Sequence, residues 1–283
     1  MNRRPITCTC RMMAVAIVIA AATIGANDIR EDIVYVEKEG VGVTYDVVPA
    51  AEPNGAAVLL MSSGGWFSRK WPVDQVKQRF GFLLDAGYTV VPVRHRSAPE
   101  FKVPDAVADV QHAVRHVRHH AANYGIDASR MAVMGFSSGG HLTLMISLDS
   151  DDGSSAETDD AVANTPNHVA AGIAYFPPVD LENSVGPNER FPALEFDPSL
   201  ATSVSPINFA DAEDPPILFL HGTEDQLVPL HNSTRMHEAL TNVGVESKLS
   251  VFEGEAHGFR DPSHQERART EILAFLASHL ITN

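Results

Sequence analysis

A five-residue segment, Gly-Phe-Ser-Ser-Gly at positions 135–139, constrains the fold of this chain more than any other feature. It follows an apolar, strand-like run at 131–134 and precedes a helix-like run at 141–148. Small residues two positions before and after a serine let the chain pass through a sharp, strained turn from strand to helix. Such a turn exposes the Ser137 hydroxyl beside the unpaired N–H groups of a helix N-terminus. We therefore predict that Ser137 is a nucleophile.

Two further loops carry candidate partners for this serine, in the order serine, aspartate, histidine. The apolar run 217–220 is followed by His-Gly-Thr-Glu-Asp, which ends at Asp225, and the run 249–252 is followed by a short loop with His257. A carboxylate on a loop after a buried strand can be held rigidly enough to orient an imidazole, and histidine readily moves protons near neutral pH. This order is the one found in α/β hydrolases and differs from two other well-known triad orders.

Each of the three residues also has a simpler interpretation. A serine in a glycine-rich turn can be structural, a loop histidine can be solvated, and aspartate is favoured in turns and at helix caps for its own reasons. Glu224, next to Asp225, is the alternative acid. The occurrence of all three motifs together, each after a strand-like run, favours the catalytic interpretation.

Strand-like and helix-like segments alternate along the remainder of the chain. We predict strands at 33–36, 43–48, 57–61, 88–93, 131–134, 169–175, 217–220 and 248–252, and helices at 73–86, 104–123, 141–148, 232–243 and 265–280. Alternation of this kind indicates an α/β fold with a mostly parallel central sheet of about eight strands and helices on both faces. No repeat or linker divides the sequence, so we expect one catalytic domain over 27–283.

The first 26 residues differ in composition from the domain that follows. Three arginines precede the apolar run 12–24, no acidic residue occurs before Asp28, and small residues stand at 25–26. This pattern predicts a signal peptide over 1–26 and export to the periplasm or the exterior, with no stable membrane partner after cleavage. An uncleaved membrane anchor is the alternative, although the run is shorter than the roughly 20 residues that span a bilayer. Both cysteines lie in this segment.

Charge and histidine content narrow the set of partners. The formal net charge of −15 argues against nucleic acid and anionic lipid as partners and disfavours polyanionic substrates. Four histidines lie on the predicted helix 104–123, namely His112, His116, His119 and His120. Two arginines are interleaved with them, and no acidic ligand is adjacent. We expect a solvated helix face there and no metal site. The oligomeric state is left open by the sequence.

Three further blocks extend the similarity to a known group. Arg-Ser-Ala-Pro-Glu at 96–100 resembles an Arg-Leu-Ala-Pro-Glu block, residues 103–109 resemble a Phe-Pro-Ala…Asp helix start, and residues 124–130 resemble the lead-in to the nucleophile strand. With the three loop motifs, they make the chain similar to the bacterial esterase/lipase group of α/β hydrolases, in its hormone-sensitive-lipase-like and carbohydrate-esterase-like branches. The resemblance covers nearly all of 43–280.

The resemblance implies an α/β-hydrolase fold and a triad of Ser137, Asp225 and His257, with no cofactor. It also implies structural rather than catalytic roles for Arg96 and Asp109. The reaction expected is serine ester hydrolysis through an acyl-enzyme, on a small-molecule or carbohydrate ester. A serine peptidase of prolyl-oligopeptidase type and a non-catalytic exported binding protein are the alternatives.

The loop after the third predicted strand departs from the group. Where relatives have His-Gly-Gly-Gly-Trp, this chain has Ser-Ser-Gly-Gly-Trp at 62–66. The resemblance implies that the backbone N–H groups of Gly64, Gly65 and Ser138 form the oxyanion hole, and a misplaced donor would cost on the order of 10²–10³ in turnover. We expect Trp66 and Phe136 to contact the substrate.

The segment 177–216, rich in Pro, Asp and Ser, lies between two predicted strands. We interpret it as a short lid or a wall of the acyl pocket, with Phe191, Leu194 and Phe196 as lining candidates. Because no large lid domain is present, short acyl chains are favoured over long ones, and acylated carbohydrates are the second substrate class that the resemblance implies.

Overall fold

The computed structural model describes residues 25, 27–38, 40–153 and 160–281 of the 283-residue chain. The predicted signal peptide therefore lies outside the described residues, apart from Gly25. Within the described part, no helix is both long enough and apolar enough to cross a membrane.

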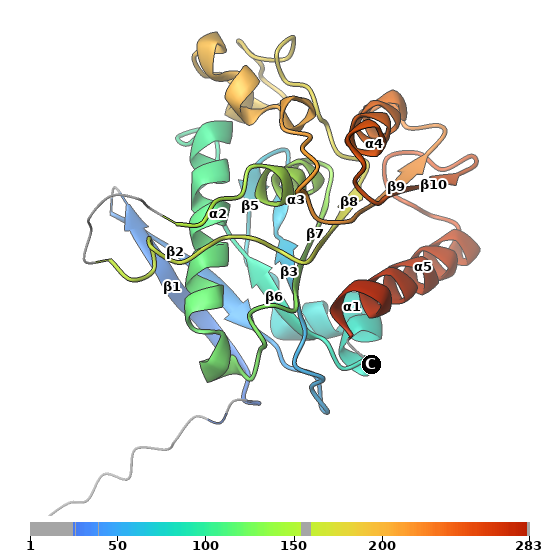
Figure 1. The fold of residues 1–283 in the computed structure, drawn as a ribbon. Helices are drawn as coiled ribbons and strands as arrows, with labels where there is room; N and C mark the ends of the chain where they lie inside the picture. The colour runs from blue at the N-terminus through green and yellow to red at the C-terminus, as the bar shows by residue number, and fades with distance from the viewer. Residues whose placement is uncertain (1–24, 26, 39, 154–159, 282–283) are drawn as a thin grey trace, which may run out of the picture.

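The centre of the molecule is a twisted sheet (Figure 1). In the described residues it has eight strands in the order β1-β2-β6-β3-β7-β8-β9-β10. Only β2 runs antiparallel to its neighbours, and all other neighbouring pairs are parallel. The strands are β1 (Arg30–Lys38), β2 (Val41–Val47), β3 (Ala57–Met61), β6 (Thr89–Val93), β7 (Met131–Phe136), β8 (Ala171–Tyr175), β9 (Ile217–Gly222) and β10 (Ser247–Phe252). The mostly parallel sheet predicted from the sequence is thus confirmed.

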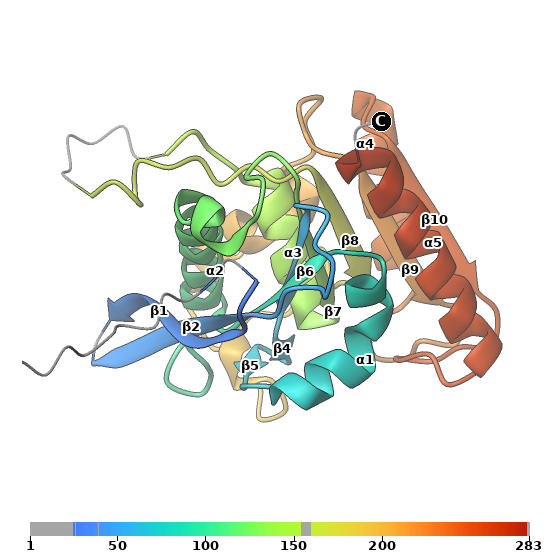
Figure 2. The same cartoon turned by 90° about the horizontal axis from the view of Figure 1, so that it is seen from below.

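Five α-helices cover the two faces of this sheet (Figures 1 and 2) in the described part of the chain. α1 (Val73–Asp85) and α5 (Pro262–Leu280) pack on one face, and α2 (Val103–His119), α3 (Ser138–Leu148) and α4 (His231–Val243) on the other. Successive side chains of a strand point to opposite faces, so Leu59 of β3 joins the core under α2, whereas Leu60 joins the core under α1 and α5. Strands buried on both faces explain the continuous apolar runs in the sequence.

Several element boundaries differ from the sequence prediction, and one hairpin was not predicted. α2 ends at His119, and a separate 3₁₀ turn covers Ala121–Tyr124, closed by Gly125 with φ of 67°. α3 begins at Ser138, three residues before the apolar run that predicted it. A small hairpin of β4 (Ser63–Gly64) and β5 (Phe67–Ser68) was not predicted, because two-residue strands carry no hydrophobic period.

The segment 177–216 contains four short 3₁₀ turns, η2 (Pro192–Leu194), η3 (Pro198–Leu200), η4 (Thr202–Val204) and η5 (Pro206–Asn208). It lies above α2 and α3 in Figure 1. The imidazole of His141 in α3 donates from Nε2 to the carbonyl of Val204 at 2.7 Å, which ties the segment to the helix that follows Ser137.

The expected solvated histidine face on α2 is partly wrong. His112 and His116 are half-buried, because the rings of Tyr35 and Tyr45 pack against them. The Tyr45 hydroxyl lies 2.8 Å from His116 Nδ1, and burial lowers the pKa of His116 to about 4. These rings fill the space between α2 and the first two strands, where sequence spacing alone gave no packing partner.

Candidate active site

The turn at Ser137 has the geometry that the glycine spacing predicted. Ser137 has φ of 55° and ψ of −120°, a strained conformation for a residue with a side chain, and it caps the N-terminus of α3. A Cβ on Gly135 would lie 2.1 Å from the carbonyl oxygen of Gly139, and one on Gly139 would lie 2.7 Å from that of Met61. Both glycines are therefore needed for β7 and α3 to meet this closely.

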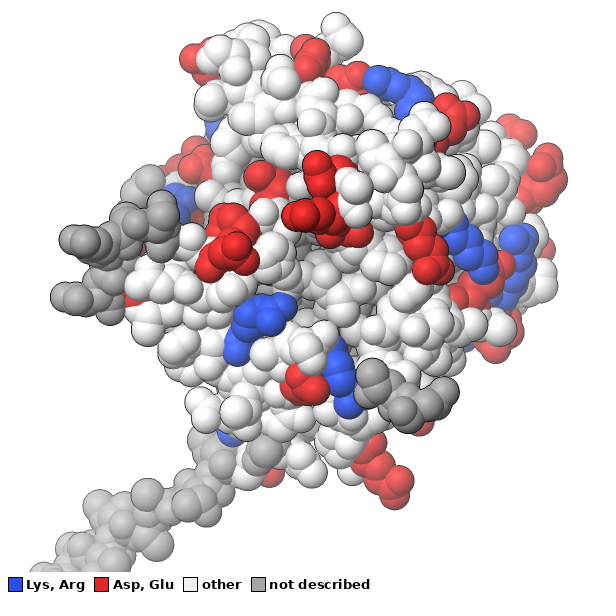
Figure 3. All heavy atoms as spheres, viewed as in Figure 1, with Lys and Arg blue, Asp and Glu red and all other residues white. Residues whose placement is uncertain are grey.

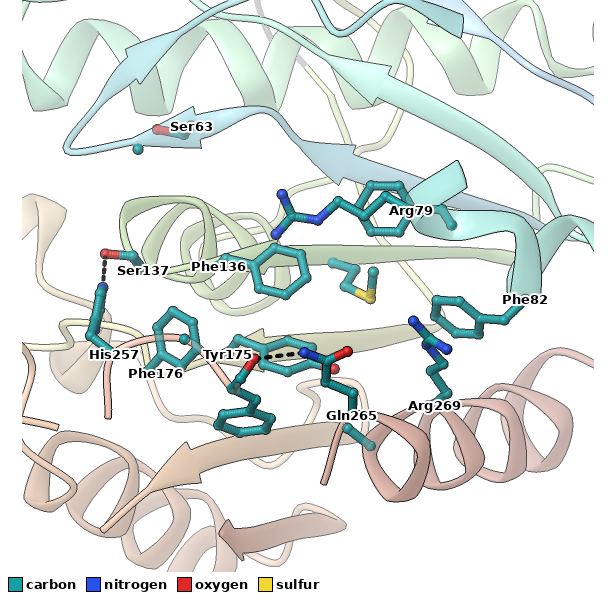
Figure 4. A pocket seen from close by; sticks show the side chains of 16 residues that line it. Ser63, Arg79, Phe82, Phe136, Ser137, Tyr175, Phe176, His257, Gln265 and Arg269 are labelled. Carbon is teal, nitrogen blue, oxygen red and sulfur yellow. Dashed lines mark hydrogen bonds between the residues drawn. The ribbon is translucent and has the colours of Figure 1, made fainter. Parts of the chain in front are cut away.

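The structure brings Ser137, His257 and Asp225 together (Figure 4 shows the first two). Their loops follow β7, β10 and β9, whose carboxyl ends meet at one edge of the sheet. His257 Nε2 lies 2.9 Å from Ser137 Oγ, and His257 Nδ1 lies 2.7 Å from Asp225 Oδ2. Because the Asp225 carboxylate can only accept, the ring proton of His257 is on Nδ1. His257 Nε2 is then free to accept a hydrogen bond from the Ser137 hydroxyl.

Asp225 is fixed from the side opposite the histidine. Its Oδ1 accepts from the backbone N–H groups of Leu227 and Val228, both at 2.9 Å, and its side chain is buried. Glu224, the alternative acid, is exposed to solvent. The carboxylate that can orient His257 is therefore that of Asp225.

Two buried polar residues that sequence reasoning missed support the triad loops. His221 lies beneath Asp225, with Nδ1 2.7 Å from Ser233 Oγ and Nε2 donating to the carbonyl of Val228 at 2.8 Å. Burial lowers the pKa of His221, which keeps its ring neutral beside the carboxylate. Glu255 accepts from the backbone N–H groups of Arg260 and Asp261, so it holds the loop that carries His257.

The candidate oxyanion donors lie where β4 faces the start of α3. The N–H groups in the first turn of α3, beginning at Ser138, have no partner within the helix. Gly65 and Trp66 have φ of 59° and 58°, so the loop turns sharply after Gly64. The indole N–H of buried Trp66 donates to His141 Nδ1 at 3.3 Å, which anchors the loop to α3.

A hydrogen-bonded chain runs through Ser63, which stands where the related group has the first glycine of this loop. His95 Nδ1 donates to the carbonyl of Arg96 at 2.6 Å, so its Nε2 must accept from Ser63 Oγ at 2.9 Å. Because the hydroxyl proton of Ser63 is donated to His95, Ser63 Oγ is the acceptor in its hydrogen bond with the Ser138 hydroxyl, at 3.0 Å. Burial lowers the pKa of His95, which keeps its ring neutral and the direction of the chain fixed. The loop is thus tied to the residue after the nucleophile.

Arg96 and Asp109, the two residues expected to be structural, form a buried ion pair. Arg96 Nε lies 3.0 Å from Asp109 Oδ2, and the backbone N–H of Arg96 donates to the same carboxylate at 2.9 Å. This pair joins the loop after β6 to α2 and holds the carbonyl of Arg96 that orients His95. Among the described residues, no group of three or more His, Cys, Asp and Glu side chains could hold a metal ion.

A family model described as BD-FAE matches residues 47–240, which is more than half of the chain. The chain belongs to the BD-FAE family. The matched region contains Ser137 and Asp225 and ends before His257.

Several relatives of this BD-FAE member are esterases. Esterase LipQ of Mycobacterium tuberculosis is 26% identical over 224 residues, which are 76% of this chain and 52% of LipQ. The chain spans about half the length of the curated relatives it matches. A truncated carbohydrate esterase from gut microbiota has a TM-score of 0.76 at 26% identity, over 90% of this chain and 97% of that one. A butyrate-bound esterase of Thermogutta terrifontis has a TM-score of 0.73 at 25% identity, over 90% and 96% of the two chains.

These comparisons confirm the resemblance found in the sequence. This BD-FAE protein is an α/β hydrolase that is similar to the bacterial esterase group.

Two cavities include Ser137 in the described part of this BD-FAE domain. The aromatic cavity, of about 520 Å³, also includes His257 and is walled by Phe80, Phe82, Phe136, Tyr175, Phe176 and Phe259 (Figure 4). The segment-side cavity, of about 370 Å³, includes Ser138 and Gly65 and is walled mainly by Pro178, Leu181, Phe191, Leu194, Leu227 and Val228. A third hollow of about 330 Å³, the rim cavity, adjoins the aromatic cavity at Ser63, Gly64, Arg79 and Phe136.

The residues expected to contact the substrate differ in which cavity they line and in how exposed they are. Phe136 lines the aromatic cavity, with its ring stacked on Tyr175 at a centroid distance of 4.4 Å. Trp66 borders the segment-side cavity, but only 5% of its surface is exposed. Phe191 and Leu194 line that cavity as expected, whereas Phe196 packs against the core next to α2. Phe196 is therefore not among the residues that line that cavity.

Proposed function

We propose that the protein hydrolyses carboxylic esters with Ser137, His257 and Asp225 as its catalytic triad. The observation that carries the proposal is the pair of hydrogen bonds at 2.9 Å and 2.7 Å that links the three side chains in order. This geometry allows His257 to take the proton of Ser137 while Asp225 stabilises the imidazolium that forms. The esterases among the relatives support the same reaction class.

In the proposed reaction, Ser137 Oγ attacks the ester carbonyl as its proton passes to His257 Nε2. Backbone N–H groups of Gly64, Gly65 and Ser138 bind the oxyanion that develops on the carbonyl oxygen. When the tetrahedral intermediate collapses, the C–O bond breaks and His257 gives the proton to the leaving alcohol. Water, activated by the same imidazole, then releases the acid from the acyl-enzyme and restores the serine hydroxyl.

The two cavities at Ser137 suggest how the ester is placed. The leaving oxygen must receive its proton from His257, which lines the aromatic cavity and not the segment-side cavity. We therefore assign the alcohol to the aromatic cavity and the acyl chain to the segment-side cavity. The butyrate bound to the Thermogutta relative supports short acyl groups. The gut carbohydrate esterase supports acylated carbohydrates as substrates.

The test is hydrolysis of p-nitrophenyl acetate, butyrate and octanoate by residues 27–283. We expect turnover that falls with chain length and is reduced to background in Ser137→Ala. Asp225→Asn should lower kcat by about 10⁴, whereas Glu224→Gln, at the neighbouring exposed carboxylate, should retain normal rates. Equal rates for the wild type and Ser137→Ala would contradict the proposal.

Two further assays address the alternatives raised by the sequence. A fluorophosphonate probe reacts only with an activated serine, so labelling of the wild type and not of Ser137→Ala would exclude a non-catalytic binding protein. A chromogenic dipeptide amide tests peptidase activity directly. We expect ester turnover to exceed amide turnover for matched acyl groups, and the reverse order would favour the peptidase.

We also propose that the protein is exported and that residues 1–26 are removed. The support is the arrangement of three arginines, an apolar run and two small residues in the sequence. Fractionation of cells that express the full chain, with N-terminal sequencing of the product, tests this. Retention in the cytoplasm with an intact N-terminus would contradict it.

A further inference from the structure

The walls of the active-site cavities differ in charge from the rest of the molecule. The chain has 36 acidic and 21 basic residues, and acidic side chains are spread across the face shown in Figure 3. In the described residues, no Asp or Glu lines the aromatic, rim or segment-side cavity. Three arginines do line the first two cavities: Arg69, Arg79 and Arg269. In a protein with a formal net charge of −15, this local excess of positive charge marks the cavities as suited to an anionic group.

Arg79 of α1 is the arginine best placed to bind such a group. It lines both the aromatic cavity and the rim cavity. Its guanidinium carbon lies 5.1 Å from the ring centroid of Phe136, the residue next to the nucleophile, and 5.4 Å from that of Trp71. Figure 4 shows Arg79 beside Phe136, on the opposite wall of the cavity from Gln265, with Ser137 and His257 at one end.

The donors of Arg79 are not used by the protein. Among the described residues, no carboxylate pairs with its guanidinium and no hydrogen bond to an acceptor is formed. Its guanidinium carbon lies 5.1–5.7 Å from the centroids of three aromatic rings, and its five N–H donors have no acceptor among the described residues. Arg79 as a residue is exposed to solvent, and desolvation of its guanidinium among the rings lowers the pKa of Arg79. Arg269, by contrast, lies 3.6 Å from Glu266.

A carboxylate is the group that fits these observations. A single planar guanidinium with free edge donors matches the two oxygens of a carboxylate. Arg79 and Arg269 stand apart in Figure 4 and do not converge on one point, so the structure favours a singly charged group. Because His257 lines the same cavity, the group belongs to the alcohol side of the ester.

We propose that the aromatic cavity recognises a carboxylate on the alcohol part of the substrate through Arg79. The substrate class is then an acylated hydroxy acid, such as a short-chain acyl ester of an acidic sugar or of a hydroxylated aromatic acid. The aromatic walls contact the ring that joins the ester oxygen to the carboxylate. This inference rests on the proposed ester hydrolysis and on the assignment of the alcohol to this cavity.

The experiment compares two acetyl esters that differ in charge on the alcohol side, 4-acetoxybenzoate and 4-acetoxybenzamide. For each protein variant the ratio of kcat/KM for the charged ester to that for the neutral ester is measured, after normalisation to hydroxide-catalysed rates. We expect the ratio to fall at least about tenfold in Arg79→Ala and Arg79→Met, the second of which keeps an apolar stem against the rings. Arg79→Lys should give an intermediate ratio.

Two controls separate a specific subsite from general electrostatics. Lys77→Ala removes a positive charge from an exposed position on the same helix that lines neither cavity, and its ratio should equal that of the wild type. Added salt should lower the wild-type ratio and leave that of Arg79→Met unchanged. An unchanged ratio in both Arg79 variants would overturn the proposal. Selective turnover of the 4-nitrophenyl monoester of glutaric acid over the pentanoate would place the carboxylate on the acyl side and overturn it as well.

Binding of the product 4-hydroxybenzoate, measured by calorimetry, tests the carboxylate subsite without requiring hydrolysis. If neither ester is hydrolysed faster than by Ser137→Ala, the proposed function fails. Binding of 4-hydroxybenzoate in preference to 4-hydroxybenzamide, lost in Arg79→Met, would still support the subsite. Equal binding of the two compounds would overturn it.

Discussion

Ser62 and Ser63 are adjacent in the sequence but differ in the hydrogen bonds of their hydroxyl groups. The hydroxyl of Ser63 joins the neutral ring of His95 to the hydroxyl of Ser138. The hydroxyl of Ser62 is buried and has no hydrogen-bond partner among the described residues. At the scale of single residues, the loop that departs from its relatives is therefore held by the second serine and not by the first.

We predict that Ser63→Ala lowers kcat about tenfold with little change in KM, because the loop that carries the proposed oxyanion donors loses its hydrogen bond to α3. Ser62→Ala is the matched control. It removes a buried hydroxyl that makes no hydrogen bond, so its turnover should stay close to that of the wild type and its stability should not fall. Steady-state kinetics with p-nitrophenyl acetate measure the effect, and equal kcat values for the two variants would contradict the assigned role of Ser63.

At the scale of elements, the contact between β7 and α3 sets the position of the nucleophile. The carbonyl oxygen of Gly139 occupies the space where a side chain of Gly135 would be. No rotamer change can relieve this contact, because both sides of it are backbone. Gly81 in α1 is the opposite case, since a Cβ there meets no atom within 4 Å.

We predict that Gly135→Ala lowers the free energy of unfolding by more than about 3 kcal/mol or prevents folding, because strand and helix must separate. Gly81→Ala, one residue past the kink at Phe80, should instead not lower it and should gain at most about 1 kcal/mol, because the added methyl meets no atom. Urea unfolding followed by circular dichroism measures both changes. A Gly135→Ala protein as stable as the wild type would show that the turn is less tightly packed than the structure indicates.

At the scale of the whole molecule, buried neutral histidines link stability to pH. His141 is fully buried between α3, Trp66 and the 177–216 segment, and burial lowers its pKa to about 4. Its pKa in the unfolded chain is roughly 6.5. Between these two values the unfolded state binds a proton that the folded state does not, so stability falls as the pH falls through this window.

We predict that His141 alone removes about 3 kcal/mol from the free energy of unfolding between pH 6.5 and pH 4. Above pH 7 it has no such effect, because the ring is neutral in both states. His141→Gln should be less stable than the wild type at pH 7 but should lose stability less steeply on acidification. Urea unfolding at pH 7, 5.5 and 4.5 measures the two slopes, and parallel curves would contradict the prediction.

Much of the fold could be predicted because its signals are local. The apolar runs of β3, β7 and β9 are buried on both faces, which is why they are continuous in the sequence. The glycines around Ser137 indicate a turn that only small residues permit. Asp225 and His257 each follow a buried strand, so a parallel sheet was enough to place them at one edge.

The remaining features depend on pairs of residues that are far apart in the chain. His95 meets Ser63 from 32 residues away, and Trp66 meets His141 from 75 residues away. Arg79 reaches the active-site cavity because α1 packs beside the end of β7. By itself, the sequence determined the strand and helix alternation, the turn at Ser137 and the three candidate catalytic residues, since each depends on neighbours within a few positions. Only the tertiary structure decided which side chains hold the candidate oxyanion loop and which charge lines the active-site cavity, because packing between elements leaves no local periodicity in the sequence.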